Sequence, residues 1–202
     1  KGNASKSAGA ANNFEEEERE VRQIILKYYA DDESENLDDL ILSVGSCQDV
    51  DYDDIDFDKL YSDLIDDLNK YNKQHDSAVA HYAIGECIDQ GSENETDFKR
   101  AFSHYLIAFE KGYKPAIEEV ARCYGWGAGV EKNIPKAIEL YESVNDYVSL
   151  IQLYRSCGWN YECEGDYESS YHWYANMMNI SSCCSEDFFV DICGLLRNLA
   201  LK

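Results

Sequence analysis

Residues 116–144 read AIEEVARCYGWGAGVEKNIPKAIELYESV, and this stretch decides the fold of the chain. Apolar Val120 and Tyr124 recur at the spacing of one helix face, and the glycine-rich residues 125–129 then break the helix. Pro135 suits the first turn of a new helix, whose apolar stripe is formed by Ala137, Leu140 and Tyr141. The pattern therefore predicts two short amphipathic helices joined by a tight turn.

The same pattern recurs along the chain, which predicts an array of helical hairpins. At an offset of 36 residues upstream, Ala80, Ile84, Gly85, Ile88 and Gly91 occupy the places of Ala116, Val120, Ala121, Tyr124 and Gly127. The second helices agree at the same offset, with Ala101 and Tyr105 in the places of Ala137 and Tyr141. A third, fainter copy at an offset of 33 is formed by Ser149, Leu153, Tyr154 and Cys157, followed by Ser170 and Tyr174. Because one short hairpin cannot bury its apolar stripe alone, the copies are expected to stack.

We therefore expect an all-α fold, an α/α solenoid of about three hairpins over residues 76–182, with different segments at its two ends. Residues 1–13 are polar and are predicted to be a disordered tail. Residues 14–75 hold three amphipathic stretches without the repeat pattern and predict an acidic N-terminal helical cap. Residues 183–202 predict a C-terminal capping helix, with an apolar face formed by Phe188, Phe189, Ile192, Leu195, Leu196 and Leu199.

The charge of the chain limits the partners that it can have. Its 40 acidic and 18 basic residues give a formal net charge of -22, which repels nucleic acid and anionic membranes and attracts basic proteins. Between residues 31 and 67 there are 15 acidic residues and a single lysine, so this region is the candidate surface for a basic partner. The alternative is that these side chains only solvate the surface.

The cysteines bear on the compartment. Eight of them could form four disulfides, but none belongs to a C-x-x-C pair and several lie at positions predicted to be inside helices. We therefore favour buried, reduced thiols and a cytoplasmic protein. No run of ~20 apolar residues predicts a membrane-spanning helix. The first residues also lack the apolar segment of a signal peptide, although a signal that has already been removed stays possible.

The second hairpin resembles a known repeat. Its pattern A-x-x-x-V-A-x-x-Y-x-x-G-x-G-V, followed by K-A-x-x-x-Y, is very similar to the Sel-1-like repeat, a relative of the tetratricopeptide repeat. The matching residues are Ala116, Val120, Ala121, Tyr124, Gly127, Gly129, Val130, Lys136, Ala137 and Tyr141. The resemblance covers residues 77–180 and is weakest in the third copy. It implies a right-handed superhelix that serves as an adaptor or scaffold, and some bacterial members of this size are secretion-system or toxin-neutralising partners.

No motif in the sequence predicts catalysis. Residues 49–60 resemble a calcium-binding loop, but Asp54 stands where that loop needs glycine and Leu60 where it needs glutamate. The cysteines and histidines lack the spacing of a zinc site, and the chain has no phosphate-binding or hydrolase motif. We therefore predict a non-enzymatic protein without metal or cofactor.

Two binding functions from different classes follow from these observations. The first is a scaffold or adaptor that binds a peptide or protein in a solenoid groove. The second is an acidic immunity or inhibitor protein that covers the active site of one basic toxin or nuclease. In either case we expect a monomer, or a heterodimer with another protein that is basic.

The candidate partner-binding residues fall into an acidic and an aromatic group. They are Asp51, Asp53, Asp54, Asp56 and Asp58, together with Trp126, Trp159 and Tyr161. Trp126 and Trp159 are predicted to lie at equivalent turns of the second and third copies, where exposed aromatic residues can anchor a partner. The alternative for the aromatic group is packing inside the repeats.

Overall fold

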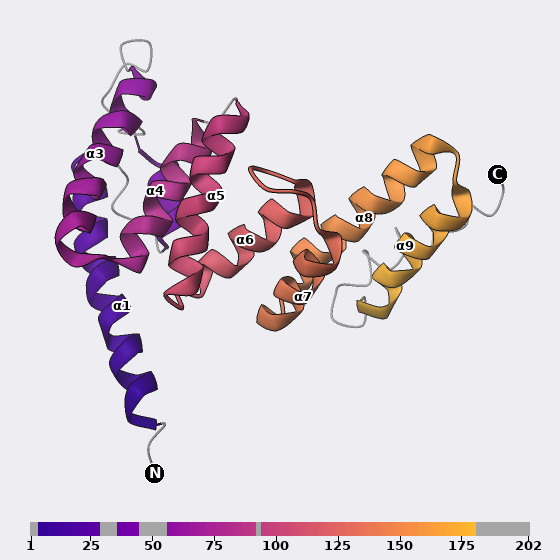
Figure 1. Ribbon diagram of the computed structural model, residues 1–202, viewed down its shortest axis with the longest axis horizontal. Helices are drawn as coiled ribbons and strands as arrows, with labels where there is room; N and C mark the ends of the chain where they lie inside the picture. The colour runs from indigo at the N-terminus through magenta and orange to yellow at the C-terminus, as the bar shows by residue number, and fades with distance from the viewer. Residues whose placement is uncertain (1–3, 29–35, 45–55, 92–93, 181–202) are drawn as a thin grey trace. The chain divides into compact units, whose positions relative to one another are not determined.

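The computed structural model describes residues 4–28, 36–44, 56–91 and 94–180, with side chains from Phe14 onward, and every regular element in these ranges is a helix (Figure 1). The helices are α1 (Ala4–Ile25), α2 (Leu37–Leu42), α3 (Phe57–His75), α4 (Ala78–Gln90), α5 (Glu95–Glu110), α6 (Pro115–Trp126), α7 (Ile134–Val144), α8 (Tyr147–Glu164) and α9 (Tyr167–Ile180). They belong to two compact units, residues 1–133 with α1–α6 and residues 134–202 with α7–α9. The predicted all-α fold is confirmed.

The first helix begins earlier than the sequence predicts. α1 starts at Ala4, so most of the predicted disordered tail over residues 1–13 is helical instead. This segment contains Ala4, Ala8, Ala10 and Ala11, and alanine has the highest helix propensity of all residues, so the helix of the acidic run can extend backwards. The predicted C-terminal capping helix, residues 183–202, lies outside the described residues.

Helix α4 is the centre of the first unit, where it contacts α1, α2, α3 and α5. Its sequence AVAHYAIGECIDQ is apolar on nearly every side, and ten of its 13 residues are buried, as expected for a helix that is surrounded by others. Ser77 caps its first turn, because the hydroxyl accepts a hydrogen bond from the backbone N–H of Ala80 at 3.1 Å. Ser77, the buried N-cap residue of α4, therefore marks the boundary between the N-terminal helices and the repeats.

Two hairpins are closed by a contact between a glycine and a tyrosine ring. In the α4–α5 hairpin, a Cβ added at Gly85 would come within 2.7 Å of the ring of Tyr105. In the α8–α9 hairpin, a Cβ at Gly158 would come within 2.5 Å of the ring of Tyr174. The structural counterpart of Gly85 is therefore Gly158, whereas the offset of 33 assigns that place to Tyr154. The predicted alignment is therefore wrong by one helical turn for the first helix of the third copy, since α8, with 18 residues, is longer than α4, whereas Tyr174 takes the place of Tyr105 as predicted.

The glycine-rich turn after α6 packs against the start of α5. The helix stops at Gly127, where φ is +78°, and the backbone N–H of Asn133 returns to the carbonyl of Tyr124 at 2.8 Å. Gly129 has a φ of +69°, and a Cβ there would overlap the backbone carbonyl of Phe98. Glycine alone permits this contact between two backbones, which is the physical reason for the G-x-G pattern of the second copy.

Candidate functional site

The acidic run of α1 holds this helix against the rest of the first unit. The hydroxyl of Ser77 donates to the Glu17 carboxylate at 2.6 Å, and that of Tyr113 donates to Glu18 at 2.9 Å. Glu20 accepts from the hydroxyl of Tyr71 at 2.6 Å. Burial, together with the neighbouring carboxylates, raises the pKa of Tyr71 and of Tyr113, so both phenols stay protonated donors. These three glutamates serve the fold rather than a partner.

Two aspartates of the acidic region 31–67 are used in the same way. The hydroxyl of Tyr82 donates to Asp38 at 2.7 Å, and that of Tyr28 donates to Asp67 at 2.8 Å. Burial is the main cause that raises the pKa of Asp38. It is also the main cause that raises the pKa of Tyr28, to about 12. Part of the charge that the sequence assigns to a partner-binding surface is therefore engaged inside the first unit.

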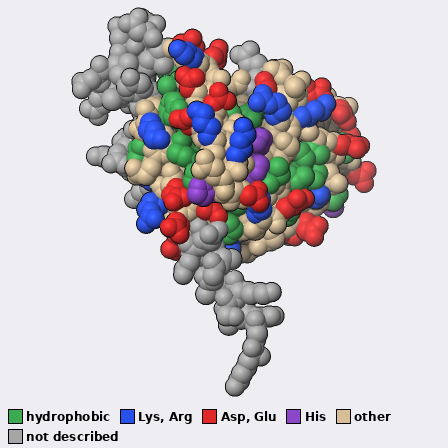
Figure 2. All heavy atoms as spheres, turned by 60° about the vertical axis from the view of Figure 1, so that its left-hand side comes forward, with side chains coloured by type: hydrophobic (Ala, Val, Ile, Leu, Met, Phe, Trp, Pro, Cys, Tyr) green, Lys and Arg blue, Asp and Glu red, His purple; other side chains and the backbone are tan. Residues whose placement is uncertain are grey.

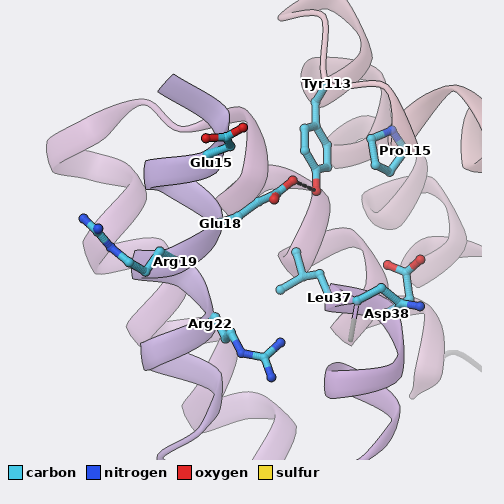
Figure 3. Close-up of a pocket in the computed structure, with 9 residues that line it drawn as sticks. Glu15, Glu18, Arg19, Arg22, Leu37, Asp38, Tyr113 and Pro115 are labelled. Atoms are coloured by element: carbon cyan, nitrogen blue, oxygen red, sulfur yellow. Dashed lines mark hydrogen bonds between the residues drawn. The ribbon is translucent and has the colours of Figure 1, made fainter. Parts of the chain in front are cut away.

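A pocket of about 460 Å³ opens between α1, α2 and the turn before α6. We call it the α1–α2 pocket, and it is lined by Glu15, Glu18, Arg19, Arg22, Asn36, Leu37, Asp38, Tyr113 and Pro115. In Figure 3, Glu18 points across to the hydroxyl of Tyr113, and Arg19 extends away from both. Charges of both signs and an apolar wall thus meet in one opening, which can hold a polar segment of another molecule.

The predicted acidic site is only partly within the described residues. Asp51, Asp53 and Asp54 lie outside them. Asp56 is the N-cap of α3 and accepts from the backbone N–H of Lys59 at 3.0 Å, while Asp58 is exposed in the first turn of that helix. On the face shown in Figure 2, lysine and arginine side chains lie among the acidic ones, so this face is not uniformly acidic.

The aromatic candidates occupy different positions from those predicted. Trp126 is the last residue of α6 and is 43% exposed, as a residue at a turn can be. Trp159 and Tyr161 are 60% and 37% exposed, but they lie within α8, which continues to Glu164. The predicted equivalence of the two tryptophans is therefore wrong, and the cause is the shift of one turn in the third copy.

Further exposed aromatic residues, which sequence reasoning missed, follow Tyr161 in the second unit. Tyr167 is 40% exposed and Tyr171 is 50% exposed, both on α9. A second opening, of about 510 Å³, is lined by Tyr161, Glu168, Ser169, Tyr171, His172, Trp173 and Ala175, and we call it the α9 pocket. The spacing of Tyr167 and Tyr171 by four residues was the available signal, because such residues share one face of a helix.

A polar cluster is buried between α4, α5 and α6. The carboxyl of Glu86 is 8% exposed and accepts from the hydroxyl of Tyr105 at 2.8 Å. Arg122 pairs with Asp89 and with Glu119, the latter at 2.7 Å. Burial, reinforced by the nearby Glu119 carboxyl, raises the pKa of Glu86 to about 8. The cluster joins the first two hairpins, with Glu86 at its buried end and Arg122 half-buried.

Two histidines form a chain of hydrogen bonds with Asn72. The backbone N–H of Ser77 donates to Oδ1 of Asn72 at 2.8 Å, so Nδ2 of Asn72 is the donor to Nε2 of His81 at 2.9 Å. His81 must then carry its proton on Nδ1 and donate it to Nδ1 of His104 at 3.0 Å. Burial lowers the pKa of both rings, that of His104 to about 4. Because Nε2 of His81 is already engaged by a donor, the pair is poorly suited to hold a metal ion.

Within the described ranges there is no group of three or more residues suited to bind a metal, and no helix with the length and hydropathy needed to cross a membrane. The described cysteines have free thiols, of which Cys87, Cys123 and Cys157 are buried and Cys163 is exposed. Cys47, Cys183, Cys184 and Cys193 lie outside the described residues.

Comparison with known proteins bears on the helical hairpins of both units. No curated protein matches the chain. The sequence model of the Sel1 repeat family matches residues 78–113, which contain α4 and α5, and residues 115–143, which contain α6 and most of α7. Sel1 repeats are generally protein-interaction modules. The two matches coincide with the first and second copies of the sequence pattern and with the helices that the structure shows there, so this part of the chain contains two Sel1 repeats.

Proposed function

We propose that this chain is a non-enzymatic scaffold or adaptor, and that its α1–α2 pocket receives a segment of a partner protein. The observation that carries the proposal is the composition of the pocket wall. Helices α1 and α2 of the cap supply charged side chains, and the junction between the two matched repeats supplies Tyr113 and Pro115. The partner would therefore contact the cap and the repeats at once, which allows a specific fit that a single helix face does not offer.

The Glu18–Tyr113 hydrogen bond keeps this pocket in a defined shape. It joins residues 95 positions apart, at a distance of 2.9 Å between the two oxygens. Tyr113 is 4% exposed, and its ring meets those of Phe14 and Tyr82 at centroid distances of 5.6 and 5.3 Å. A wall held by aromatic packing and a hydrogen bond loses little conformational entropy when a ligand binds, and this favours affinity.

The test uses a pair of matched charge reversals. Glu15→Lys changes an exposed residue of the pocket, and Glu131→Lys changes an exposed residue outside it in the same unit. The wild type and both variants are immobilised, proteins from the native host are captured, and the retained proteins are quantified by mass spectrometry. We expect Glu15→Lys to lose at least one protein that the wild type and Glu131→Lys retain. Equal capture by all three would refute a role for the pocket.

The second hypothesis, an inhibitor of one basic toxin or nuclease, rests on the charge of residues 31–67. The same capture experiment separates it from the scaffold hypothesis. The inhibitor hypothesis expects a single basic partner, bound at low salt and lost when Asp51, Asp53, Asp54 and Asp56 are all changed to Asn. The scaffold hypothesis expects several partners that tolerate these changes.

We also propose that the protein works in a reducing compartment such as the cytoplasm. The free thiols of the described cysteines support this proposal, because an oxidising compartment favours disulfides. Its test is a titration of thiols in protein purified from the host without reductant.

A further inference from the structure

The turn end of the α8–α9 hairpin is rich in exposed aromatic rings. The four large side chains there are Trp159, Tyr161, Tyr167 and Tyr171, which are 60%, 37%, 40% and 50% exposed. Scattered single aromatic residues on a surface need no explanation, whereas four exposed ones within 13 residues of one hairpin are an unusual concentration. Tyrosine and tryptophan are also the residues that most often dominate the binding energy of interfaces.

Two of these four residues, Tyr161 and Tyr171, line a pocket. The α9 pocket has a volume of about 510 Å³ and is bordered by the rings of Tyr161, Tyr171, His172 and Trp173. The ring of Trp173 is held in place by Tyr154 at a centroid distance of 5.8 Å and by His172 at 6.5 Å. The carboxylate of Glu168 belongs to the same wall. An incoming group would therefore meet several aromatic rings and a negative charge together.

The charge around the pocket has one dominant sign. Residues 147–180 contain a single basic residue, Arg155, and four acidic residues, which are Glu162, Glu164, Asp166 and Glu168. Two of these carboxylates have structural uses, because Glu162 accepts from Tyr174 at 3.3 Å and Asp166 accepts from the backbone N–H of Ser169 at 3.1 Å. Glu164 and Glu168 are exposed at the two sides of the turn. The electrostatic potential at the pocket thus favours a cation.

We propose that the α9 pocket binds an arginine side chain from a basic segment of a partner protein. Aromatic faces attract cations, and arginine has the planar guanidinium that both stacks on a ring and forms paired hydrogen bonds with a carboxylate such as Glu168. This inference deepens the proposed function, since it rests on the chain being a protein-interaction module and names the chemistry of one partner segment.

The test measures binding of labelled peptides to the full chain by fluorescence anisotropy. The probe is a 12-residue peptide in which four arginines alternate with glycine and serine, and the comparison peptides carry lysine, leucine or glutamate in place of arginine. Tyr171→Leu removes a ring while keeping an apolar side chain, and Tyr171→Phe keeps the ring. Phe57→Leu is the matched control, because Phe57 is an aromatic residue of the first unit that is 39% exposed.

We expect the arginine peptide to bind more tightly than the lysine peptide, and the other two to bind weakly. Tyr171→Leu should weaken binding of the arginine peptide about fivefold, the size of one cation–π contact. Tyr171→Phe should stay within about twofold of the wild type, and Phe57→Leu should match it. Glu168→Gln should weaken binding and reduce its dependence on salt.

Three results would overturn the inference. Equal affinities of wild type and Tyr171→Leu would assign binding to the net charge of the chain. Tight binding of the leucine peptide would assign the pocket to an apolar segment, and no binding of any peptide would exclude a cationic ligand. The proposed function has its own test in the Glu15→Lys capture experiment. If that experiment supports the α1–α2 pocket while the wild type binds no arginine peptide, only the present inference is refuted.

Discussion

Replacing the buried Glu86 carboxyl by an amide should change how the stability of the first unit depends on pH. The carboxyl is 8% exposed, accepts a hydrogen bond from Tyr105 at 2.8 Å, and has a pKa that burial raises from 4.5 to about 8. The nearby carboxyls of Glu119 and Asp38 raise the pKa further, and the guanidinium of Arg122 lowers it. Glu86→Gln keeps the shape and the acceptor for Tyr105 but cannot lose a proton.

The sign of the effect follows from proton binding by the two states. Between pH 4.5 and 8 the unfolded chain has lost the Glu86 proton while the folded protein retains it. The free energy of unfolding therefore falls as pH rises through this range, by about 1.4 kcal/mol per pH unit and about 5 kcal/mol in total. In Glu86→Gln the amide has no proton to lose, so this fall in the free energy of unfolding is absent. Near pH 4.5 the two proteins should be similarly stable, and at pH 8 the variant should be more stable by several kcal/mol.

The assay is urea denaturation at pH 5, 6, 7 and 8. Fluorescence of Trp126 reports on the first unit when Trp159 and Trp173, the other two tryptophans, are replaced by phenylalanine in every protein compared. Glu131→Gln is the control, because this residue is exposed. Some pH dependence will remain in Glu86→Gln, since burial also raises the pKa of Glu119. Parallel pH profiles of wild type and Glu86→Gln would refute the buried, protonated carboxyl.

Three further outcomes are expected. Because burial lowers the pKa of His104 to about 4, the free energy of unfolding of the wild type should fall as pH falls from 6.5 towards 4. Urea denaturation should show a smaller fall in His104→Gln. An equal fall would argue against a neutral His81–His104 pair. Gly158→Ala places a methyl group against the Tyr174 ring and should cost about 1–3 kcal/mol in thermal unfolding of the second unit, whereas Gln152→Ala on the exposed side of α8 should cost under about 0.5 kcal/mol. Thiol titration of the unreduced protein in denaturant should find eight thiols, and a count near zero would contradict a reducing compartment. Among the four described cysteines, the exposed Cys163 should react first in the native state.

The sequence predicts the helical hairpins well because their signal is local. Ala80, Ala101, Ala116 and Ala137 recur at fixed offsets, and each is at most 1% exposed in the structure. Small residues at such positions let two helices approach, so the spacing in the chain encodes the packing directly. The third copy, which has Ser170 in the place of one of these alanines, is the one whose first helix was aligned one turn away from its true position.

The candidate binding surfaces are less predictable because they depend on distant residues. Glu18 and Tyr113 are 95 positions apart, and neither belongs to a motif, so their hydrogen bond has no signal in a single sequence. The same holds for the α1–α2 pocket that they border. Acidic composition correctly indicated a charged N-terminal region, but it cannot distinguish a carboxylate that accepts from a tyrosine, as Asp38 does, from one that faces solvent.

The docking of α1 also has a consequence for the order in which the chain folds during synthesis. This helix leaves the ribosome before α2–α9, but the hydroxyl groups that bind its glutamates follow 51, 60 and 95 residues later, at Tyr71, Ser77 and Tyr113. Contacts of such sequence separation form slowly. Until Tyr113 emerges, α1 has only part of its final attachment, and its apolar Val21 and Ile25, both fully buried in the finished protein, must wait for their neighbours. The acidic run of residues 15–18 within this helix would keep the waiting segment soluble.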